Sequence, residues 1–576
     1  MSLPIHFLRP ATQGFAIGLL LALAGCGVSS EGEVSRAAPV PSQPATQPEA
    51  EMPASPVVEE RAKLRSEATA SAYLSKAPAA MIAPAPMADY QQGGYRDVPR
   101  EQYQNLPQNP VHAVAEAPVS TFSIDVDTGS YANVRRILNE GRLPPEGAVR
   151  LEEMVNYFPY DYALPADGSP FGITTELAPS PWNPQTRLLR IGIRASDRSI
   201  AELAPANLVF LVDVSGSMDR REGLPLVKST LKLLVDRLRE QDRVALVVYA
   251  GESRVVLEPT SGRDKAKIRA AIDQLSAGGS TAGASGIEMA YQMAQKGFIK
   301  DGINRILLAT DGDFNVGISD FDTLKQMAAE RRRSGVSLTT LGFGVDNYNE
   351  RLMEQLADAG DGNYAYIDNL REARKVLVDQ LSSTLAVVAK NVKIQLEFNP
   401  ATVSEYRLLG YENRALKRED FNNDQVDAGE IGAGHTVTAL YEIVPTGARG
   451  WLDDLRYQQA KPQGSGKGDE LALLRVRYQA PEGGASRLVE RPVRMAEQRA
   501  SLAQASDDLR FAAAVAAFAE QLRGGRYTGA FGMGDTVQLA RAARGDDRFG
   551  LRGEFVQLAE LAQSLQTPIP TQARTE

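Results

Sequence analysis

The stretch Asn207–Asp219, NLVFLVDVSGSMD, joins a run of apolar residues to three oxygen-bearing side chains. Its apolar residues 208–212 are typical of a strand that is buried on both faces, as in a parallel sheet covered by helices. Asp213, Ser215 and Ser217 follow at alternate positions. In open α/β sheets, ligands bind outside the carboxyl ends of the strands. The stretch therefore predicts a parallel sheet with a ligand site at the end of this strand.

The chain after this strand alternates regularly between helix and strand patterns. The first helix, Leu224–Arg239, has apolar residues at the 3.6-residue spacing of a helix with one buried face. Further strands are expected at 244–250, 254–257, 305–310, 336–343 and 364–367. Further helices are expected at 265–275, 323–333, 350–357 and 372–389, and one more follows the loop GGSTAGASG and ends at Ala294. This alternation predicts an α/β domain with a doubly wound parallel sheet over residues 205–390.

Both flanks of this α/β unit have the alternating pattern of antiparallel strands. Residues 171–204 contain two expected strands, 171–176 and 187–194, which a turn-rich segment joins. Residues 391–500 contain three more, with the sequences VKIQLEF, TVTALYEIV and LALLRVRYQ. If the two groups share their sheets, the α/β unit is inserted in an antiparallel β-sandwich.

The outer regions of the ordered sequence are mainly helical. Residues 118–170 contain an expected strand at 121–126 and helices at 131–139 and 151–157. Residues 501–576 carry two apolar stripes with helical spacing. The stripes are Phe511, Val515, Phe518, Leu522 and Phe555, Leu558, Leu561, Leu565. We interpret them as core positions rather than as a surface for a partner.

Residues 1–25 have the pattern of a bacterial signal peptide. The apolar run Gly14–Ala24 is too short to span a membrane and has the length of a signal-peptide core. It is followed by Gly25 and Cys26, so that the junction Leu-Ala-Gly-Cys resembles the bacterial lipobox. This resemblance implies cleavage before Cys26 and a lipid anchor on that cysteine. Gly27, by similarity to the sorting signals of Gram-negative bacteria, favours the outer membrane of the cell envelope.

Residues 26–117 are predicted to be a disordered tether. Their composition is dominated by Pro, Ala, Ser, Gln and Glu, as in AAPVPSQPATQPEAEMPASPVVEE. Such a sequence buries too little apolar surface to offset the entropy lost on ordering. The ordered part of the chain is therefore expected to hang from the lipid on a flexible segment.

Composition excludes several classes of function. The net charge of -9 argues against nucleic acid as a partner, because phosphate neutralisation needs basic clusters. The chain has a single cysteine, which excludes an internal disulfide. One cysteine and three histidines are also too few for a thiolate- or histidine-rich zinc site. Only His435 lies in a region predicted to be packed, so catalysis by a Ser-His-Asp triad is disfavoured. A hard-cation site made of oxygen ligands remains open.

Three loops at the carboxyl ends of expected strands offer such oxygens. The first carries Asp213, Ser215 and Ser217, the second (GGSTAGASG) carries Thr281, and the third (Thr-Asp-Gly) carries Asp311. Carboxylates and hydroxyls without nitrogen or sulfur are typical of a hard-cation site. With few protein oxygens and room for water, Mg²⁺ is favoured, and Mn²⁺ and Ca²⁺ are the alternatives.

This pattern resembles the metal-ion-dependent adhesion site of von Willebrand factor type A domains. The resemblance rests on DVSGSM after an apolar strand, followed at fitting distances by the threonine and Thr-Asp-Gly loops. It implies that Ser215, Ser217 and Thr281 bind the ion directly, whereas Asp213 and Asp311 act largely through water. It also implies an outward coordination position that a glutamate or aspartate of a partner fills.

The order of the regions resembles that of the von Willebrand factor type A lipoproteins of Gram-negative bacteria, in which an associated N-terminal region and an uncharacterised C-terminal region flank the domain. The resemblance implies a non-catalytic, membrane-tethered module that binds an acidic side chain of a partner protein. It further implies that ligand binding shifts the last helix of the domain, 372–389. The alternative is a metal-assisted envelope hydrolase, for which the sequence offers no general base near the site.

Four other motifs have simpler explanations. Asp127-Thr128-Gly129 resembles an aspartic-protease signature, but there is no second copy, so Asp127 or Thr128 is expected to cap the following helix. The run 464–468, GSGKG, lacks the glycine spacing and the hydroxyl of a phosphate loop. The acidic run 417–430 departs from a calcium loop at its glycine and at its final glutamate, although a surface calcium stays open. Arg331–Arg333 suits the last turn of a helix.

Overall fold

The structure is a computed structural model that describes residues 101–165, 168–279, 283–312, 321–345, 348–453, 455–456 and 468–566. All of these residues belong to one compact unit, Gly94–Glu576. The predicted signal peptide, Cys26 and most of the predicted tether lie outside the described residues. The end of the predicted tether, residues 101–117, is packed rather than disordered, because His112–Ala113 pairs with Tyr406 and Glu405 as a strand and Val114 is buried. Within the described part, none of the helices has the length and apolar character needed to cross a membrane.

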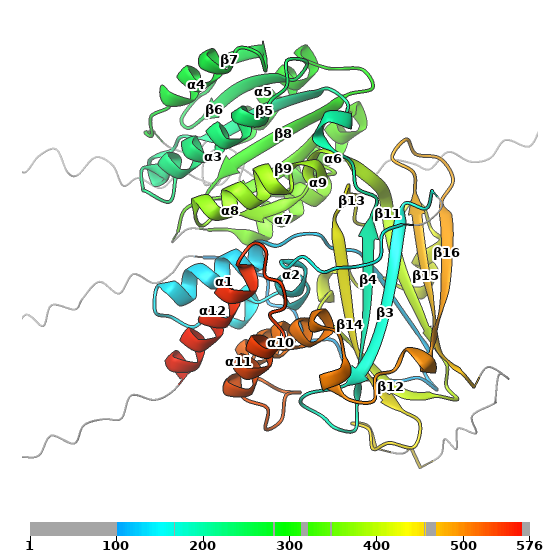
Figure 1. Cartoon of the computed structure of the whole chain (residues 1–576). Coiled ribbons are helices and arrows are strands. Elements are labelled where there is room, and N and C mark those ends of the chain that lie inside the picture. The colour runs from blue at the N-terminus through cyan, green and yellow to red at the C-terminus, as the bar shows by residue number, and fades with distance from the viewer. Residues whose placement is uncertain are drawn as a thin grey trace, which may run out of the picture. The chain divides into compact units, whose positions relative to one another are not determined.

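The α/β unit is built on a six-stranded sheet (Figure 1). Its strands, in sheet order, are β10 (Tyr364–Tyr366), β9 (Ser337–Gly342), β8 (Ile303–Thr310), β5 (Ala206–Asp213), β6 (Arg243–Tyr249) and β7 (Ser253–Ser261). All neighbouring pairs are parallel except β6 and β7. The apolar stretch of the sequence therefore forms a central strand, β5, that is buried along its whole length.

Helices cover both faces of this sheet. They are α3 (Leu224–Arg237), α4 (Lys265–Asp273), α5 (Gly283–Lys296), α6 (Phe321–Arg331), α7 (Glu350–Ala359), α8 (Leu370–Arg374) and α9 (Leu381–Leu385). Phe210 and its alternate neighbours on β5 share a core with α3, α4 and α8. Val209 and Leu211 share the opposite core with α5, α6 and α7. The five apolar residues of β5 are thus divided between two hydrophobic layers, as expected for a doubly wound sheet.

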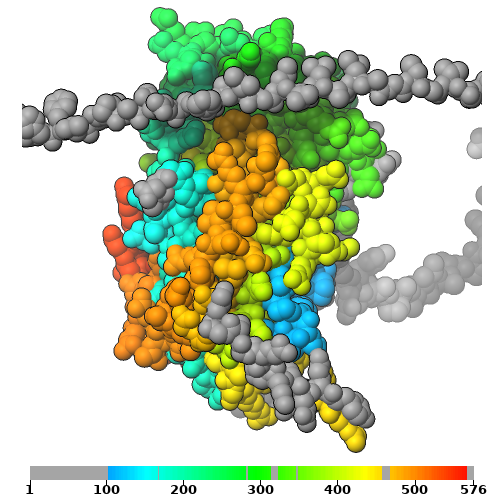
Figure 2. All heavy atoms as spheres, turned by 90° about the vertical axis from the view of Figure 1, so that its right-hand side faces the viewer, coloured from blue at the N-terminus to red at the C-terminus, as the bar shows by residue number. Residues whose placement is uncertain are grey.

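The flanking strands form a β-sandwich whose two sheets enclose one hydrophobic core. One sheet has the order β1 (His112–Ala113), β12 (Val403–Leu409), β14 (Thr436–Pro445), β4 (Arg187–Ala195) and β3 (Phe171–Pro179). The other has β13 (Ile431–Gly432), β11 (Val387–Phe398), β15 (Glu470–Gln479) and β16 (Arg487–Arg494), with β2 (Val119–Ser123) paired to β11. Figure 2 shows β15 and β16 in orange at the surface of the molecule.

The α/β unit is inserted in this sandwich. Strand β4 precedes the unit in the sequence and pairs along its length with β14, which follows the unit, from Arg194 opposite Thr436 to Arg187 opposite Ile443. The predicted fold class, a doubly wound sheet with an antiparallel sandwich and a helical C-terminal segment, is confirmed.

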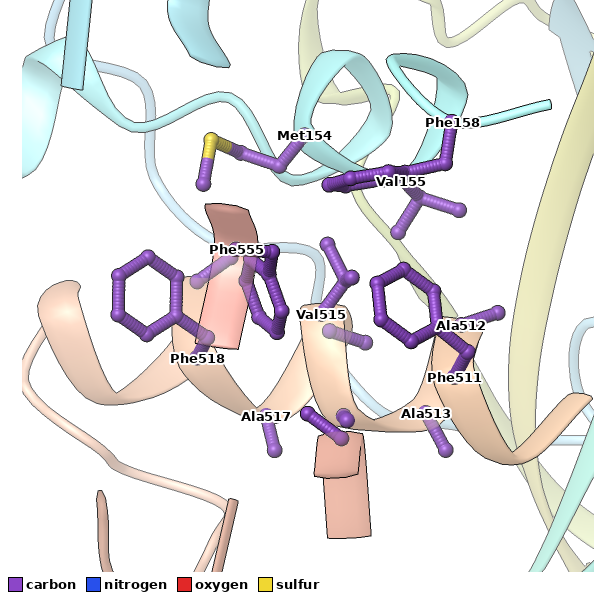
Figure 3. Close-up of a cluster of buried hydrophobic side chains, with 14 of the residues drawn as sticks. Met154, Val155, Phe158, Phe511, Ala512, Ala513, Val515, Ala517, Phe518 and Phe555 are labelled. Atoms are coloured by element: carbon purple, nitrogen blue, oxygen red, sulfur yellow. The ribbon is translucent and has the colours of Figure 1, made fainter. Parts of the chain in front are cut away.

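A helical layer combines the two ends of the described chain. It contains α1 (Gly129–Asn139), α2 (Leu151–Asn156), α10 (Asp507–Leu522), α11 (Met533–Ala542) and α12 (Leu551–Gln566). In Figure 3, Phe158 lies against Phe511 and Phe555, with ring centroids 4.9 and 5.7 Å away. Both predicted apolar stripes of the C-terminal region belong to this core or pack against it, so their interpretation as core is confirmed.

The last helix of the α/β unit differs from the prediction. Instead of one helix over 372–389, the chain forms α8, a π-helical turn η5 (Lys375–Asp379) and α9. Strand β11 already begins at Val387, where it pairs with Gly432 of β13. The β-branched pair Val387-Val388 favours a strand, and pairing within the sandwich overrides the helical pattern that precedes it.

Candidate metal site at the edge of the parallel sheet

Asp213, the last residue of β5, organises the first loop of the site. Its Oδ1 accepts a hydrogen bond from the Ser215 backbone N–H at 2.8 Å. The Ser215 and Ser217 hydroxyl oxygens lie 3.0 Å apart, because a short 3₁₀ turn, η3 (Gly216–Met218), follows Ser215. The three side chains that alternate in the sequence are therefore brought together at one point.

Asp311 reaches the same edge from the neighbouring strand. Val212 of β5 lies opposite Ala309 of β8, so the next residues, Asp213 and Thr310, are adjacent. The Thr310 hydroxyl donates to Asp213 Oδ2 at 2.8 Å. Burial and then the charge of Asp311 raise the pKa of Asp213 to about 6, although the hydrogen bonds from Ser215 and Thr310 lower it. Two carboxylates thus share one buried edge of the sheet.

The second loop is fixed beside the first. The Gly278 N–H donates to the Val214 carbonyl at 2.8 Å, and the Gly216 N–H donates to the Gly279 carbonyl at 3.1 Å. Gly279 has a φ of +93°, in the left-handed region that favours glycine. Thr281 itself lies outside the described residues, which continue at Gly283, the first residue of α5. The ligand role of Thr281 stays a prediction.

The donors described at this edge fit a hard cation. They are two carboxylates and two hydroxyls, the ligand types that Mg²⁺ and Ca²⁺ prefer. His435 lies elsewhere, in the residue just before β14 of the sandwich. The geometry therefore brings together Asp213, Ser215, Ser217 and Asp311 and places no histidine among them.

The predicted cap of α1 is wrong. Thr128 is the N-cap residue, but its side chain makes no capping hydrogen bond. Asp127 Oδ1 instead accepts a hydrogen bond from the Tyr364 N–H of β10 at 2.8 Å. Asp127 therefore joins the N-terminal region to the α/β unit rather than starting a helix.

Asp127 also belongs to a buried acidic group that sequence analysis missed. Carboxylate oxygens of Asp125, Asp127 and Glu354 all lie within 4.8 Å of one another. The Arg414 guanidinium lies among them, with N–O distances of 3.2 Å to Asp125, 3.3 Å to Asp127 and 3.4 Å to Glu354. An arginine thus fills the position that a metal would need.

The acidic run 417–430 also surrounds basic groups. Lys393 Nζ donates to the backbone carbonyl of Asp420 at 3.2 Å, and Arg477 pairs with Asp424 at 3.0 Å. These contacts favour a structural loop over a calcium site. Nearly all of GSGKG lies outside the described residues, and Arg331 ends α6 as expected.

Glu350 on α7 is buried at 1% exposure, and neither of its carboxylate oxygens has a hydrogen-bond partner among the described residues. Burial raises its pKa to about 8; Arg150 opposes this rise, and the neighbouring acids Glu354 and Glu152 add to it. In the folded chain the Glu350 carboxyl group therefore holds a proton over a pH range in which the same group is ionised in the unfolded chain.

Lowering the pH from about 8 to about 5 is expected to stabilise the fold through Glu350. Because its pKa of about 8 in the folded state exceeds its ordinary value of 4.5, the folded chain binds more protons across this window. Urea unfolding at several pH values should show a shallower pH dependence for Glu350→Gln than for wild type. Exposed Glu240 provides a control, since Glu240→Gln should keep the wild-type slope; an unchanged slope in Glu350→Gln would contradict the prediction.

Comparison with known proteins agrees with this architecture. Residues 207–380 match the family model described as von Willebrand factor type A domain, and 97–190 match one described as von Willebrand factor. Residues 383–565 match the C-terminal family of uncharacterized protein YfbK. YfbK of Escherichia coli (strain K12) is 53% identical over 472 residues, which cover 81% of each chain. The chain belongs to the YfbK family.

Other proteins are similar to parts of this chain. Uncharacterized protein sll0103 of Synechocystis is 29% identical over 329 residues, which cover 56% of this chain and 73% of that protein. Among solved structures, a von Willebrand factor type A protein from Catenulispora acidiphila is 16% identical, with a TM-score of 0.38, and covers 69% of this chain and 91% of its own. The predicted type A domain, hereafter the A domain, is confirmed by the family match.

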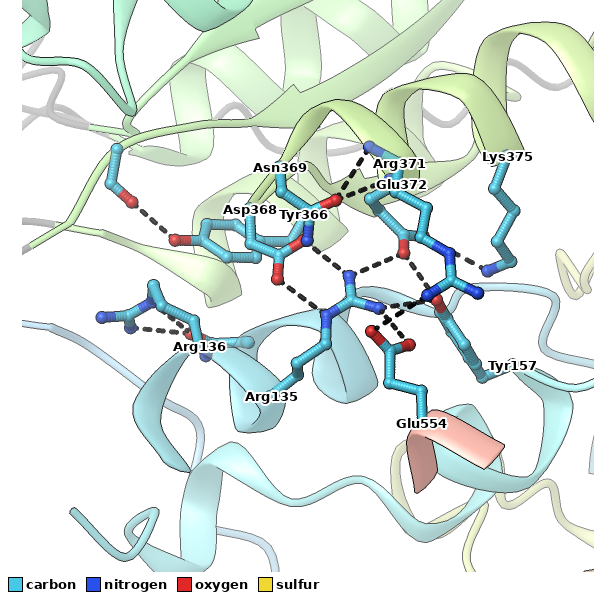
Figure 4. A network of polar contacts seen from close by, with 12 residues as sticks. Arg135, Arg136, Tyr157, Tyr366, Asp368, Asn369, Arg371, Glu372, Lys375 and Glu554 are labelled. Carbon is cyan, nitrogen blue, oxygen red and sulfur yellow. Dashed lines mark hydrogen bonds and ion pairs between the residues drawn. The ribbon is translucent and has the colours of Figure 1, made fainter. Parts of the chain in front are cut away.

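A buried arginine of this YfbK family member holds the A domain against its flanking regions (Figure 4). Arg135 of α1 donates from Nε to Asp368 at 2.8 Å and from Nη2 to Glu372 at 2.8 Å, and it pairs with Glu554 of α12 at 3.2 Å. Tyr157 completes the network by donating to Glu372 at 2.6 Å. The arginine side chain is only 2% exposed. No local pattern in the sequence indicates this network, because the three carboxylate partners of Arg135 lie more than two hundred positions away.

Proposed function

We propose that this chain is a metal-dependent protein-binding module that recognises an acidic side chain of a partner in the cell envelope. It contains a von Willebrand factor type A domain, a class that commonly mediates metal-dependent protein interactions. The observation that carries the proposal is the convergence of Asp213, Ser215, Ser217 and Asp311 at one sheet edge.

In this proposal Mg²⁺ is the resident ion, with Mn²⁺ and Ca²⁺ as alternatives. Ser215, Ser217 and Thr281 would hold it through their hydroxyls, and Asp213 and Asp311 largely through water. When bound, the ion supplies an open coordination position for a carboxylate of a partner. Asp213 keeps the serine loop and Thr310 in place through its two hydrogen-bonded oxygens. We take the chain to be a binding module rather than an enzyme, because both carboxylates at this edge are assigned to the ion and His435 lies elsewhere.

The proposal includes a lipid anchor on Cys26 that holds the chain to the outer membrane. Its support is the sequence Leu-Ala-Gly-Cys after an apolar run and the composition of the following residues. A single acyl chain gives only marginal membrane binding, whereas the several chains of a lipoprotein anchor bind durably.

A pull-down from envelope extract tests both parts of the proposal. Wild type should retain a partner in Mg²⁺ and release it in EDTA, and Asp213→Ala should fail to retain it in either condition. Asp264, an exposed aspartate of the same domain, supplies the control Asp264→Ala, which should behave as wild type. A Cys26→Ser chain should leave the membrane fraction and still bind the partner.

Identical sets of retained proteins with Mg²⁺, with EDTA and with Asp213→Ala would contradict metal-bridged binding. Hydrolysis of envelope components that disappears in Asp213→Ala would instead favour the metal-assisted hydrolase. Retention of Cys26→Ser in the membrane fraction would contradict the anchor alone.

A further inference from the structure

A cavity of about 600 Å³ lies where the end of the A domain meets the sandwich and the helical layer. Residues of α8, η5 and α9 form one wall, the segments around β4 and β14 form another, and the end of α2 and the start of α12 close the space. Small-molecule sites commonly have this size and occur at junctions between domains. The cavity is separate from the cluster around Asp213, since none of that cluster's residues lines it.

Basic side chains predominate in the lining. Arg194, Arg371, Arg374 and Lys375 line the cavity, against two carboxylates, those of Asp197 and Asp379. The lining therefore carries two more basic than acidic groups, although the whole chain has a net charge of -9. Such a concentration of one sign of charge in a hollow attracts ions of the opposite sign.

The lining also contains the imidazole of His435, which adds no charge. Burial, and then the nearby charge of Lys375, lower the pKa of His435 to about 4. The imidazole is therefore neutral near pH 7 and offers the cavity a hydrogen bond rather than a charge.

Two of the arginines have donors that the described protein leaves unused. Arg374 is exposed and makes no ion pair or hydrogen bond through its side chain with any described residue. Arg194 Nε is buried and has no hydrogen-bond partner among the described residues. Buried donors without partners are rare in folded proteins. Arg374 thus has a whole guanidinium free to bind an oxyanion, for which arginine has a matching fork of donors. Arg194 adds one unused N–H, since its Nη1 already donates to the Tyr162 carbonyl at 3.3 Å.

The other cations of the wall are already fixed in place. Lys375 Nζ lies 3.2 Å from Glu372 and 3.4 Å from the centroid of the Tyr157 ring, as the labelled side chains in Figure 4 illustrate. Arg371 donates to the Phe549 carbonyl at 2.7 Å. These contacts order the wall before a ligand arrives, which lowers the entropic cost of binding.

The lining also has apolar and aromatic side chains. Tyr157, Phe158, Phe549 and Leu551 are among them, beside polar residues such as Ser382 and Thr436. A ligand with an apolar body and a charged end matches such a surface better than a bare inorganic ion. The wall also contains η5, and π-helical turns of this kind are frequent at functional sites.

We propose that this cavity is a second binding site, which takes a small organic anion with a carboxylate or phosphate group on an apolar body. The cationic wall holds the anionic group, and the aromatic residues hold the body. The cavity is too small for a folded partner, so the ligand is a small molecule rather than an acidic protein surface.

Calorimetry with benzoate and phenyl phosphate tests this site on the full chain. The chain is first treated with EDTA, which is then dialysed away, so that anions cannot bind through a metal near Asp213 and EDTA cannot compete for the cavity. The titrations contain about 0.15 M salt to screen surface charges. Benzyl alcohol and benzylamine, which have the same ring without a negative charge, are the matched probes. At least one anion should bind with a dissociation constant below about 1 mM, and the uncharged and cationic probes should not bind.

Two variants locate the binding. Arg374→Gln should weaken the anion at least about tenfold, because it removes a free guanidinium, whereas Arg333→Gln, an exposed arginine elsewhere on the A domain, should bind like wild type. Gln380→Trp should abolish binding by filling the cavity without changing its charge. The proposal is wrong if neither anion binds saturably. It is also wrong if Arg374→Gln binds the anion as tightly as wild type does, or if benzyl alcohol binds as tightly as the anion.

Discussion

Replacing Asp213 by alanine is expected to weaken Mg²⁺ binding by about 10- to 100-fold. Asp213 contributes one of the two carboxylates at the sheet edge, and its two oxygens hold Ser215 and Thr310 at 2.8 Å each. Its loss therefore removes a charge and also releases the hydroxyl-bearing loop. Isothermal titration with Mg²⁺ on the full chain measures the effect directly, without any partner.

Asp213→Asn separates the two contributions of this residue. The amide keeps an acceptor for one hydrogen bond but removes the negative charge, so it should bind Mg²⁺ weakly while unfolding at nearly the wild-type temperature. Asp264→Ala should leave the affinity unchanged. If Asp213→Ala binds Mg²⁺ as tightly as wild type, the ion is held elsewhere and the proposed ligand set is wrong.

Replacing Arg135 by methionine is expected to destabilise the fold by about 3–5 kcal/mol. The substitution removes the buried cation that neutralises Asp368 and Glu372, while both carboxylates stay in the interior. Urea unfolding of the full chain should show this loss, and Arg142→Met, at an exposed ion pair, should cost less than about 1 kcal/mol.

A second change should restore part of the lost stability. In Arg135→Met with Asp368→Asn, the carboxylate that has lost its cation is neutral, while Glu372 still pairs with Lys375, so the double variant should be more stable than Arg135→Met alone. Equal stability of the single and the double variants would mean that packing of the long Arg135 side chain, rather than neutralisation, is its main contribution.

The Arg135 network bears on how the A domain responds to a ligand. Asp368 lies two residues before the start of α8 and Glu372 lies on α8, and both are attached to α1 and α12 through one guanidinium. A shift of the last helix, which the resemblance to other type A domains implies, must break or carry along these contacts. That shift stays a prediction, and the flanking regions are the elements that would resist it.

Much of the candidate site was predictable because its residues are local in sequence. Asp213, Ser215 and Ser217 lie within five positions, and a buried apolar strand fixes where they emerge. Asp311 follows a strand of the same kind, so the rule that ligands bind at the carboxyl edge was enough to bring the two loops together. The end of the last helix was not predictable, because Val387 joins a strand only when β13 is beside it.

The sequence by itself determined the α/β domain, the sandwich strands, the core stripes and the oxygen donors at the sheet edge. Each of these depends on periodicity or on neighbouring positions, which a single chain displays directly. Only the tertiary structure decided that Arg414 fills the acidic group around Asp127, that Arg135 holds α8, and that Arg194 and Arg374 line one cavity. Whether a buried charge stabilises the fold depends on which distant residues neutralise it, and no local sequence pattern indicates that pairing.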